Sequence, residues 1–230
     1  MWRRASRSVL RICLRRGAIF SSPSFCRAQG RDEEALRRAQ EGLWVFEDGR
    51  PDERLAFFAV DLLSKAGRKS DAEAHLWRTF EKAPSVELYA RLRKLGGEAA
   101  HERAIAFLEA RLAEETRTPW HNPADLLIRI LMHEKMFDAA WAAVRRYGAS
   151  MGVKEALART SKATHPREVV DVYAERVDQL ANAGGDQAYA EAAKLIARMA
   201  TLRSAAEQTA YVAALKERFG RKRNLMKLLG

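Results

Sequence analysis

This chain of 230 residues contains only two cysteines, Cys13 and Cys26, and both lie within its first 30 residues. The remainder therefore has no thiol for a disulfide or a cysteine-ligated metal, which fits a reducing compartment. No stretch approaches the ~20 apolar residues of a membrane span. Sustained period-2 alternation is also missing and β-branched residues are sparse, so the sequence favours helix throughout.

The sequence also lacks the common catalytic and nucleotide-binding motifs. It has no Walker A loop, no glycine-rich dinucleotide loop and no G-x-S-x-G. None of the five histidines pairs with another at helical spacing; they are His75, His101, His121, His133 and His165. We therefore predict a protein that is not an enzyme and has no cofactor or metal. The most site-like candidate is His121 beside Trp120, and an enzyme built around it is a third hypothesis.

Acidic residues are missing from both ends of the chain. Residues 1–30 contain arginine as their only charged residue type, and residues 220–230 contain Arg221, Lys222, Arg223 and Lys227. Between them, residues 31–219 hold 30 basic and 30 acidic residues, so the net charge of +11 belongs to the two ends. A basic pI of this origin does not indicate that the central part binds nucleic acid.

These shifts in composition predict three segments. Residues 1–30 are expected to be a disordered basic tail or a targeting segment, because their arginine and serine content resembles that of an organellar transit peptide. A start site placed upstream of the true one is a further alternative. Residues 31–219 are expected to form one helical-repeat domain, and residues 220–230 a basic and apolar tail. We expect a cytoplasmic protein, with organellar import as the alternative.

The clearest pattern runs from Leu55 to Pro84 and predicts two antiparallel helices. Leu55, Phe58 and Leu62 recur on one helical face. Gly67 can adopt positive φ and end this first helix. Ser70 and Glu73 have the spacing of a capping box that begins the second helix.

Helical periodicity continues on both sides of this hairpin and predicts about eleven helices. Pro84 ends the second helix of the hairpin, and Ser85 offers a cap to the next. Most connections are two to six residues long, so successive helices are expected to be antiparallel neighbours that stack into a solenoid. Further helices are expected near residues 32–46, 85–95, 98–115, 123–132, 137–147, 150–162, 166–183, 189–199 and 205–219.

The second half of the hairpin resembles a tetratricopeptide repeat. Gly67, Ala72, Leu76, Thr79 and Pro84 stand at the offsets that this family uses for its glycine, small, large apolar, small and proline positions. Two first-helix positions depart from the family, with alanine in place of leucine and leucine in place of tyrosine. The resemblance implies an all-α, tetratricopeptide-like α-solenoid whose concave face binds peptides. A matched set of Lys, Arg and Asn in successive repeats is not visible.

Residues 155–229 resemble the end of a group of uncharacterised bacterial helical proteins. The matching features are Ala163-Thr-His-Pro166, Tyr189-Ala-Glu-Ala-Ala-Lys-Leu195 and Arg221-Lys-Arg-Asn-Leu-Met-Lys-Leu-Leu229. Some members carry a SWIM-type zinc finger upstream, whose Cys-x-Cys and Cys-x-His pairs are lacking here, so zinc binding is not carried over. The resemblance implies a bacterial protein and a chain that is the C-terminal portion of a longer one, and it assigns no activity.

Two functions follow as hypotheses. The first is a non-enzymatic helical-repeat scaffold for protein–protein interaction, with a protein or peptide partner. The second is a nucleic-acid-associated accessory module that uses the basic termini. The candidate partner or phosphate contacts are Arg221, Lys222, Arg223 and Lys227. Near them, Leu225, Met226, Leu228 and Leu229 form an apolar patch that docks on the last helices, on a partner or beside nucleic acid.

Overall fold

A computed structural model describes residues 24, 26–28, 30–45, 52–114 and 122–229, without the side chains of residues 42–45. These residues fold into α-helices joined by turns, with no β-strand in the described part, which confirms the predicted all-α class. No helix within these ranges is long and apolar enough to cross a membrane. The helices are α3 (Asp32–Val45), α4 (Glu53–Lys65), α5 (Lys69–Lys82), α6 (Val86–Glu114), α7 (Ala124–His133), α8 (Phe137–Tyr147), α9 (Met151–Ser161), α10 (Pro166–Ala183), α11 (Asp186–Ala200), α12 (Ala205–Phe219) and α13 (Arg223–Leu228).

The chain divides into two compact units, Met1–Arg111 and Leu112–Gly230. The sequence predicted one domain over residues 31–219, and composition does not mark the division at Arg111. Cys26, which the sequence placed in the N-terminal tail, is buried with Ala35, Ala39 and Leu55. Packed structure in the first unit therefore begins before residue 30.

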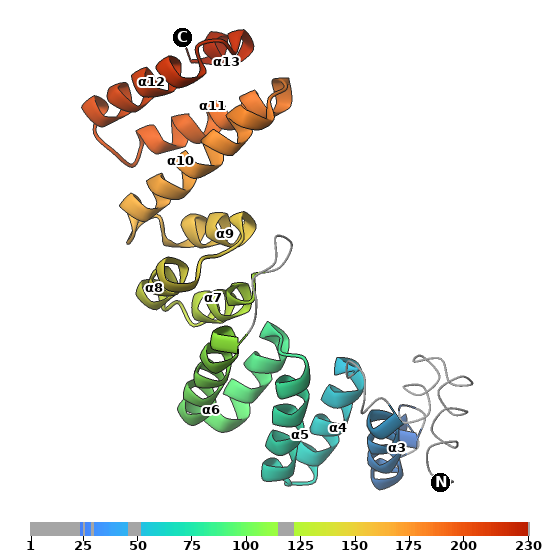
Figure 1. Cartoon of the computed structure of the whole chain (residues 1–230). Helices are drawn as coiled ribbons and strands as arrows, with labels where there is room; N and C mark the ends of the chain where they lie inside the picture. Colours follow the sequence, from blue (N-terminus) through green and yellow to red (C-terminus); the bar gives the residue numbers. More distant parts are fainter. Residues whose placement is uncertain (1–23, 25, 29, 46–51, 115–121, 230) are drawn as a thin grey trace. The chain divides into compact units, whose positions relative to one another are not determined.

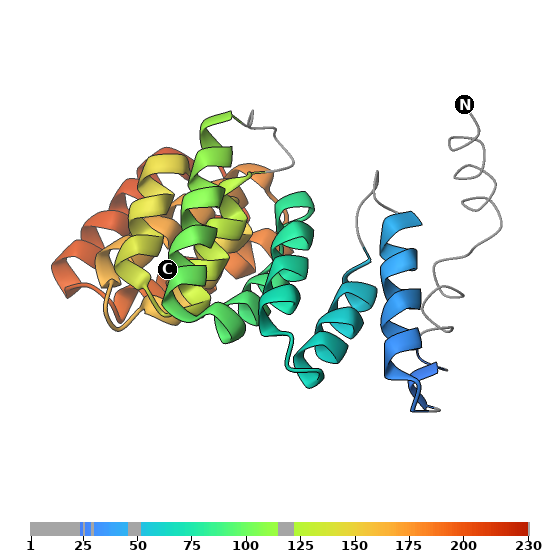
Figure 2. The same ribbon diagram turned by 90° about the horizontal axis from the view of Figure 1, so that it is seen from below.

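In the first unit, α4 and α5 form the hairpin predicted from the sequence, and α3 lies beside α4 (Figures 1 and 2). Gly67 has the expected positive φ, and Ala59 and Ala72 are fully buried, as close approach of the two helices requires. The predicted capping box at Ser70 and Glu73 is wrong, because α5 begins at Lys69. An exposed ion pair between Arg68 and Asp71, with 2.7 Å between Nη2 and Oδ2, stands at this helix start instead.

The predicted break between the helices near 85–95 and 98–115 is confirmed as a kink within α6, where Gly97 has φ 61° and ψ −142°. A side chain at Gly96 would clash, since a Cβ there would lie 2.8 Å from both Ala100 Cβ and Glu73 Oε1. The two arms of α6 are further joined by a buried contact of 2.7 Å between the Tyr89 hydroxyl and His101 Nδ1.

In the second unit, α7 and α8 form one hairpin and α10 and α11 another, with α9 between them in sequence and in contact with α7, α8 and α10 (Figure 1). Asn122 caps α7 by accepting a 3.0 Å hydrogen bond from the Ala124 amide. Ser204 and Glu207 form a capping box at the start of α12. Those hydrogen bonds from Ser204 lower the pKa of the Glu207 carboxyl.

Candidate binding site

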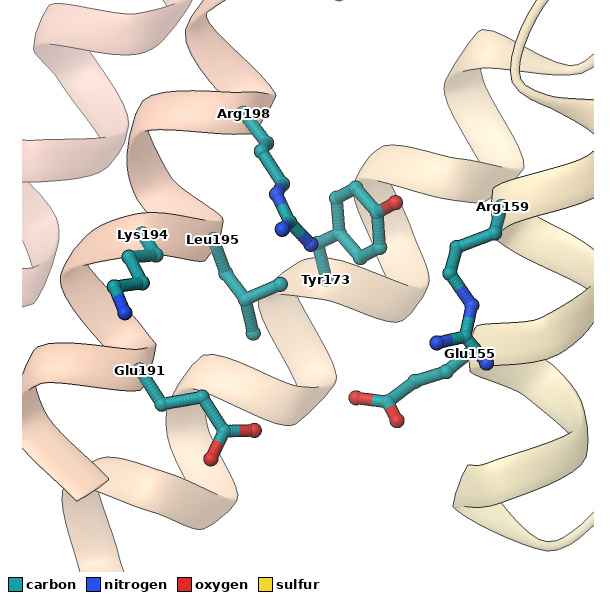
Figure 3. A pocket seen from close by; sticks show the side chains of 7 residues that line it. All are labelled: Glu155, Arg159, Tyr173, Glu191, Lys194, Leu195 and Arg198. Carbon is teal, nitrogen blue, oxygen red and sulfur yellow. The ribbon is translucent and has the colours of Figure 1, made fainter. Parts of the chain in front are cut away.

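A pocket of about 160 Å³ opens between α9, α10 and α11 in the second unit (Figure 3). Helix α10 lies against both of the other helices, so its middle turns form the base of the pocket. Tyr173 comes from α10, and Glu155 and Arg159 come from α9. Helix α11 supplies the rest of the lining, which is Glu191, Lys194, Leu195 and Arg198.

Helical spacing places the lining side chains of α9 on one wall of the pocket and those of α11 on the opposite wall. Glu155 and Arg159 are four residues apart on α9, and Glu191, Leu195 and Arg198 follow at steps of four and three on α11. Residues at such steps share a helix face. Tyr173 and Leu195 are 5 % and 6 % exposed and form an apolar floor, whereas the arginines are exposed at the rim.

The two carboxylates of the pocket are engaged by one arginine beneath them. Arg176 lies one turn after Tyr173 on α10; its Nε is 3.4 Å from Glu155 Oε1 and its Nη2 is 3.2 Å from Glu191 Oε1. In the part of the chain that the structure describes, Arg159, Lys194 and Arg198 have no ion pair. Four basic groups thus stand against two carboxylates, which gives the site a net charge of +2.

A broader hollow lies where the starts of α10 and α12 meet, lined by Arg167, Arg203 and Ser204 among others. Arg203 is used within the fold, because its Nε donates a 2.7 Å hydrogen bond to Gln208 Oε1 and its guanidinium stacks 4.3 Å from the Tyr211 ring centroid. Burial raises the pKa of Tyr211 to about 12. The contacts of Arg203 therefore stabilise the packing of α12 and leave this arginine engaged within the fold.

The C-terminal segment folds as α13 and packs against α11 and α12. Leu225 is fully buried, and Asn224 Nδ2 donates a 2.9 Å hydrogen bond to Asp186 Oδ1. Docking of this segment on the last helices, one of three alternatives from the sequence, is therefore confirmed. Leu228 remains 50 % exposed.

The four basic residues predicted as partner or phosphate contacts are not among the described residues that line the pocket. Lys222 Nζ donates to the Asn182 carbonyl oxygen at 3.4 Å and lies over the Phe219 ring. Arg221, Arg223 and Lys227 are exposed, and none of the three has an ion pair within the described ranges. They form a basic surface on α13 and the turn before it, which remains a candidate for anion contact.

Three side chains linked in series, Asp138, His165 and Thr164, have the composition of a catalytic triad. His165 Nε2 lies 2.9 Å from Asp138 Oδ1, and His165 Nδ1 lies 2.8 Å from Thr164 Oγ1. The Thr164 hydroxyl, however, already donates to the Ser161 carbonyl oxygen at 3.1 Å, and the Asp138 side chain is fully exposed. A nucleophile must give its proton to the base, and this hydroxyl gives it to the backbone. The arrangement links the start of α8 to the start of α10.

The other histidines, where the structure describes them, do not form a cluster that could hold a metal ion. His75 is half-buried on α5, where burial, followed by the charge of Arg78, lowers the pKa of its imidazole. His121 and Trp120 lie outside the described residues. Across the described ranges, no group of three His, Cys, Asp or Glu side chains is placed to hold a metal ion.

The pocket residues were not singled out in the sequence. Their signal is the charge spacing on α11, where Glu191, Lys194 and Arg198 share a face, but surface helices carry many such faces. Only the packing of α9 and α11 on either side of α10 brings Arg159 and Arg198 to one opening. The exposed cations of α13 were the candidates that composition made visible.

No protein-family model matches this chain, and no curated protein matches it either. The class is therefore defined by the structure itself, as an all-α protein containing antiparallel helix hairpins. The tetratricopeptide and SWIM-associated resemblances stay predictions.

Proposed function

We propose that this protein is a non-enzymatic, tetratricopeptide-like scaffold for protein–protein interaction. The observation that carries the proposal is the pocket between α9, α10 and α11, which combines a Tyr173 and Leu195 floor with a charged rim. An apolar centre within a polar, solvent-accessible rim is the usual arrangement of a protein interface. Arginine and tyrosine are also enriched among the residues that dominate binding energy.

The helix hairpins support the same proposal. In α4 and α5 the small residues Ala59 and Ala72 are fully buried between apolar neighbours, and Leu76 is fully buried at the family's large apolar position. Repeats of this kind bury their faces against neighbours and present side chains from successive helices on one surface. The pocket is lined in that way, by three consecutive helices.

The test is capture of partners from native cell extract with the full chain and two charge-reversed variants. Arg198→Glu changes the pocket. Arg129→Glu is the matched control, because Arg129 is an exposed arginine of α7 with no ion pair in the described structure and lies outside the pocket. We expect a stoichiometric protein that survives nuclease and moderate salt, is lost with Arg198→Glu and is retained with Arg129→Glu. Equal capture by all three chains would overturn the assignment to the pocket.

A second candidate function is a nucleic-acid-associated module that acts through the C-terminal basic surface. The observation in its favour is that Arg221, Arg223 and Lys227 are exposed without an ion pair among the described residues. Its test is oligonucleotide binding against salt concentration by the chain and by the triple variant Arg221→Gln, Arg223→Gln, Lys227→Gln. Removal of one side chain that binds a phosphate should reduce the salt slope by about 1. An unchanged slope would remove this candidate.

The proposal includes a cytoplasmic bacterial protein, with organellar import as the alternative if residues 1–30 are a transit peptide. Intact-mass analysis of the endogenous chain tests the import alternative, because retention of residues 1–30 contradicts import, whereas their loss fits either import or a true start site downstream. Retention of residues 1–30 would leave the cytoplasmic proposal standing.

A further inference from the structure

We propose that the pocket between α9, α10 and α11 binds a single phosphate monoester, carried as phosphoserine or phosphothreonine on the partner protein. This inference rests on the proposed function and names the chemistry of the partner. It follows from the position of the pocket's cations, from the state of its carboxylates and from the tyrosine at its floor.

The cations of the pocket come from opposite walls. Arg159 projects from α9 and Arg198 from α11, on either side of Tyr173 (Figure 3). Neither has an ion pair within the described structure, and Lys194 adds a third such cation at the rim. Arginine presents a planar set of donors that matches phosphate oxygens, so two arginines facing one space suit an oxyanion.

The carboxylates cancel only one of these three positive charges, because Arg176 engages both and offsets the other. Its guanidinium nitrogens lie 3.4 Å from Glu155 and 3.2 Å from Glu191. The remaining net charge of +2 matches a phosphate monoester, which carries about −1.5 to −2 at neutral pH. A nucleic-acid backbone fits less well, since its neighbouring phosphates would approach the same two carboxylates.

Tyr173 provides a neutral donor at the floor. The residue is only 5 % exposed, it lines the pocket, and its hydroxyl has no hydrogen-bond partner among the described residues. The hydroxyl oxygen is not among the buried unpartnered atoms of the described residues, so it reaches solvent and can donate to a ligand that becomes its partner. A phosphate oxygen in the pocket would be that partner, while Leu195 contacts the carbon chain of the phosphorylated residue.

The experiment measures binding by the full chain of inorganic phosphate and of a phosphoserine test peptide, with the unphosphorylated peptide and a single-stranded oligonucleotide as comparisons. We expect saturable phosphate binding and tighter phosphopeptide binding. Arg159→Gln and Arg198→Gln should each weaken both by about ten-fold or more, since hydrogen bonds to charged groups are strong. Tyr173→Phe should weaken both a few-fold.

Arg129→Gln is the control and should leave binding unchanged, and circular dichroism should confirm that every variant stays helical. Phosphate binding that is absent, or that Arg159→Gln and Arg198→Gln leave intact, would overturn the proposal. Tighter binding of the oligonucleotide, abolished by the same two variants, would assign the pocket to nucleic acid and overturn it too.

Phosphatase treatment of the cell extract separates this inference from the proposed function. A partner that Arg198→Glu loses and that phosphatase treatment also removes supports both. A partner that survives phosphatase treatment keeps the scaffold and overturns the phosphate inference. Phosphate binding in the pocket with no captured partner would reject the scaffold and keep the site.

Discussion

Two arginines of the first unit and two arginines of the second unit are placed in different surroundings. In the first unit, Arg91 pairs with Asp61 at 2.6 Å while lying 4.3 Å from the Phe57 ring centroid. Arg103 likewise pairs with Glu81 at 3.2 Å and stacks 4.0 Å from the Trp77 centroid. Each guanidinium has both an acid and an aromatic partner from a neighbouring helix. In the second unit, Arg159 and Arg198 face a pocket without an ion pair in the described structure.

This difference separates arginines that hold helices together from arginines that are available to a ligand. A surface ion pair contributes ~0–1 kcal/mol and a cation–π contact about as much, so the first kind contributes modestly to stability. The second kind contributes little until an anion arrives. Composition alone gives both units arginines in abundance and does not distinguish the two uses.

The largest expected effect comes from truncating a buried leucine in each unit, which tests whether the two cores are equally well packed. Leu76 in α5 and Leu157 in α9 are both fully buried. Replacing either with alanine removes buried methyl groups and leaves a cavity, which should lower the free energy of unfolding by about 2–5 kcal/mol. Urea denaturation measures it. A cost below about 1 kcal/mol in one unit would indicate a loosely packed core there.

Tyr89→Phe should have the next largest effect. It removes the hydroxyl that lies 2.7 Å from His101 Nδ1 in the interior of the first unit. Leaving a buried polar group without a partner costs about 1–3 kcal/mol of unfolding free energy. Thermal denaturation measures the loss. Tyr147→Phe, on a half-buried tyrosine of α8, is the control and should cost less than about 0.5 kcal/mol.

Tyr211 gives the second unit an alkaline sensitivity. Burial raises its pKa to about 12 from 10.0, so the folded state keeps the proton that the unfolded state releases. The stabilisation is complete below pH 10 and disappears as the pH rises toward 12. After a discount for partial exposure, we expect about 1–2 kcal/mol. Unfolding free energies above pH 10 should fall less for Tyr211→Phe than for the native chain; parallel curves would contradict this.

The comparison of arginines is tested directly by Arg103→Gln and Arg198→Gln. The first should lower stability by about 0.5–1 kcal/mol, because it removes an ion pair and a stacked ring. The second should change stability by less than about 0.5 kcal/mol. Of these two variants, only Arg198→Gln should reduce phosphate binding. Calorimetry and phosphate titration of both variants measure the two quantities. If both variants lose stability equally, Arg198 is a structural residue.

The smallest expected effect is an acid sensitivity of the first unit at His75. Its pKa is lowered from 6.5, by burial first and then by Arg78 and Arg68 against the opposing charge of Asp71. The neutral imidazole is therefore favoured by folding, and its stabilisation is present above pH 6.5 and disappears as the pH falls through the lowered folded-state pKa. His75→Gln should lose less stability on acidification, as stability measured from about pH 7 to about pH 5 will test. An identical decline would contradict the shift.

Much of the local structure was predictable because it depends on near neighbours in the chain. Gly67 ends α4 with positive φ, Asn122 caps α7, and Ser204 with Glu207 caps α12. The one failed cap is instructive. Ser70 and Glu73 have the right spacing, but Arg68 and Asp71 stand at the actual start of α5, and spacing alone does not choose between overlapping starts.

The candidate site was less predictable, because its residues come from three helices. Arg221, Arg223 and Lys227 were found from composition, since a basic run without acids is visible in one dimension. Arg159 and Arg198 are 39 positions apart and each sits in a helix of mixed charge. Burial of Leu225 likewise needed the position of α13 on α11.

The sequence by itself determined that the chain is helical and where most helices begin and end, because hydrogen bonding, capping and periodicity act within a few residues. Only the tertiary structure decided which faces meet. It buried Cys26 with α3 and α4, divided the chain at Arg111, and gave both carboxylates of the pocket to Arg176. The physical reason is that a charge is paired or left available according to its spatial neighbours, which packing selects and local sequence does not.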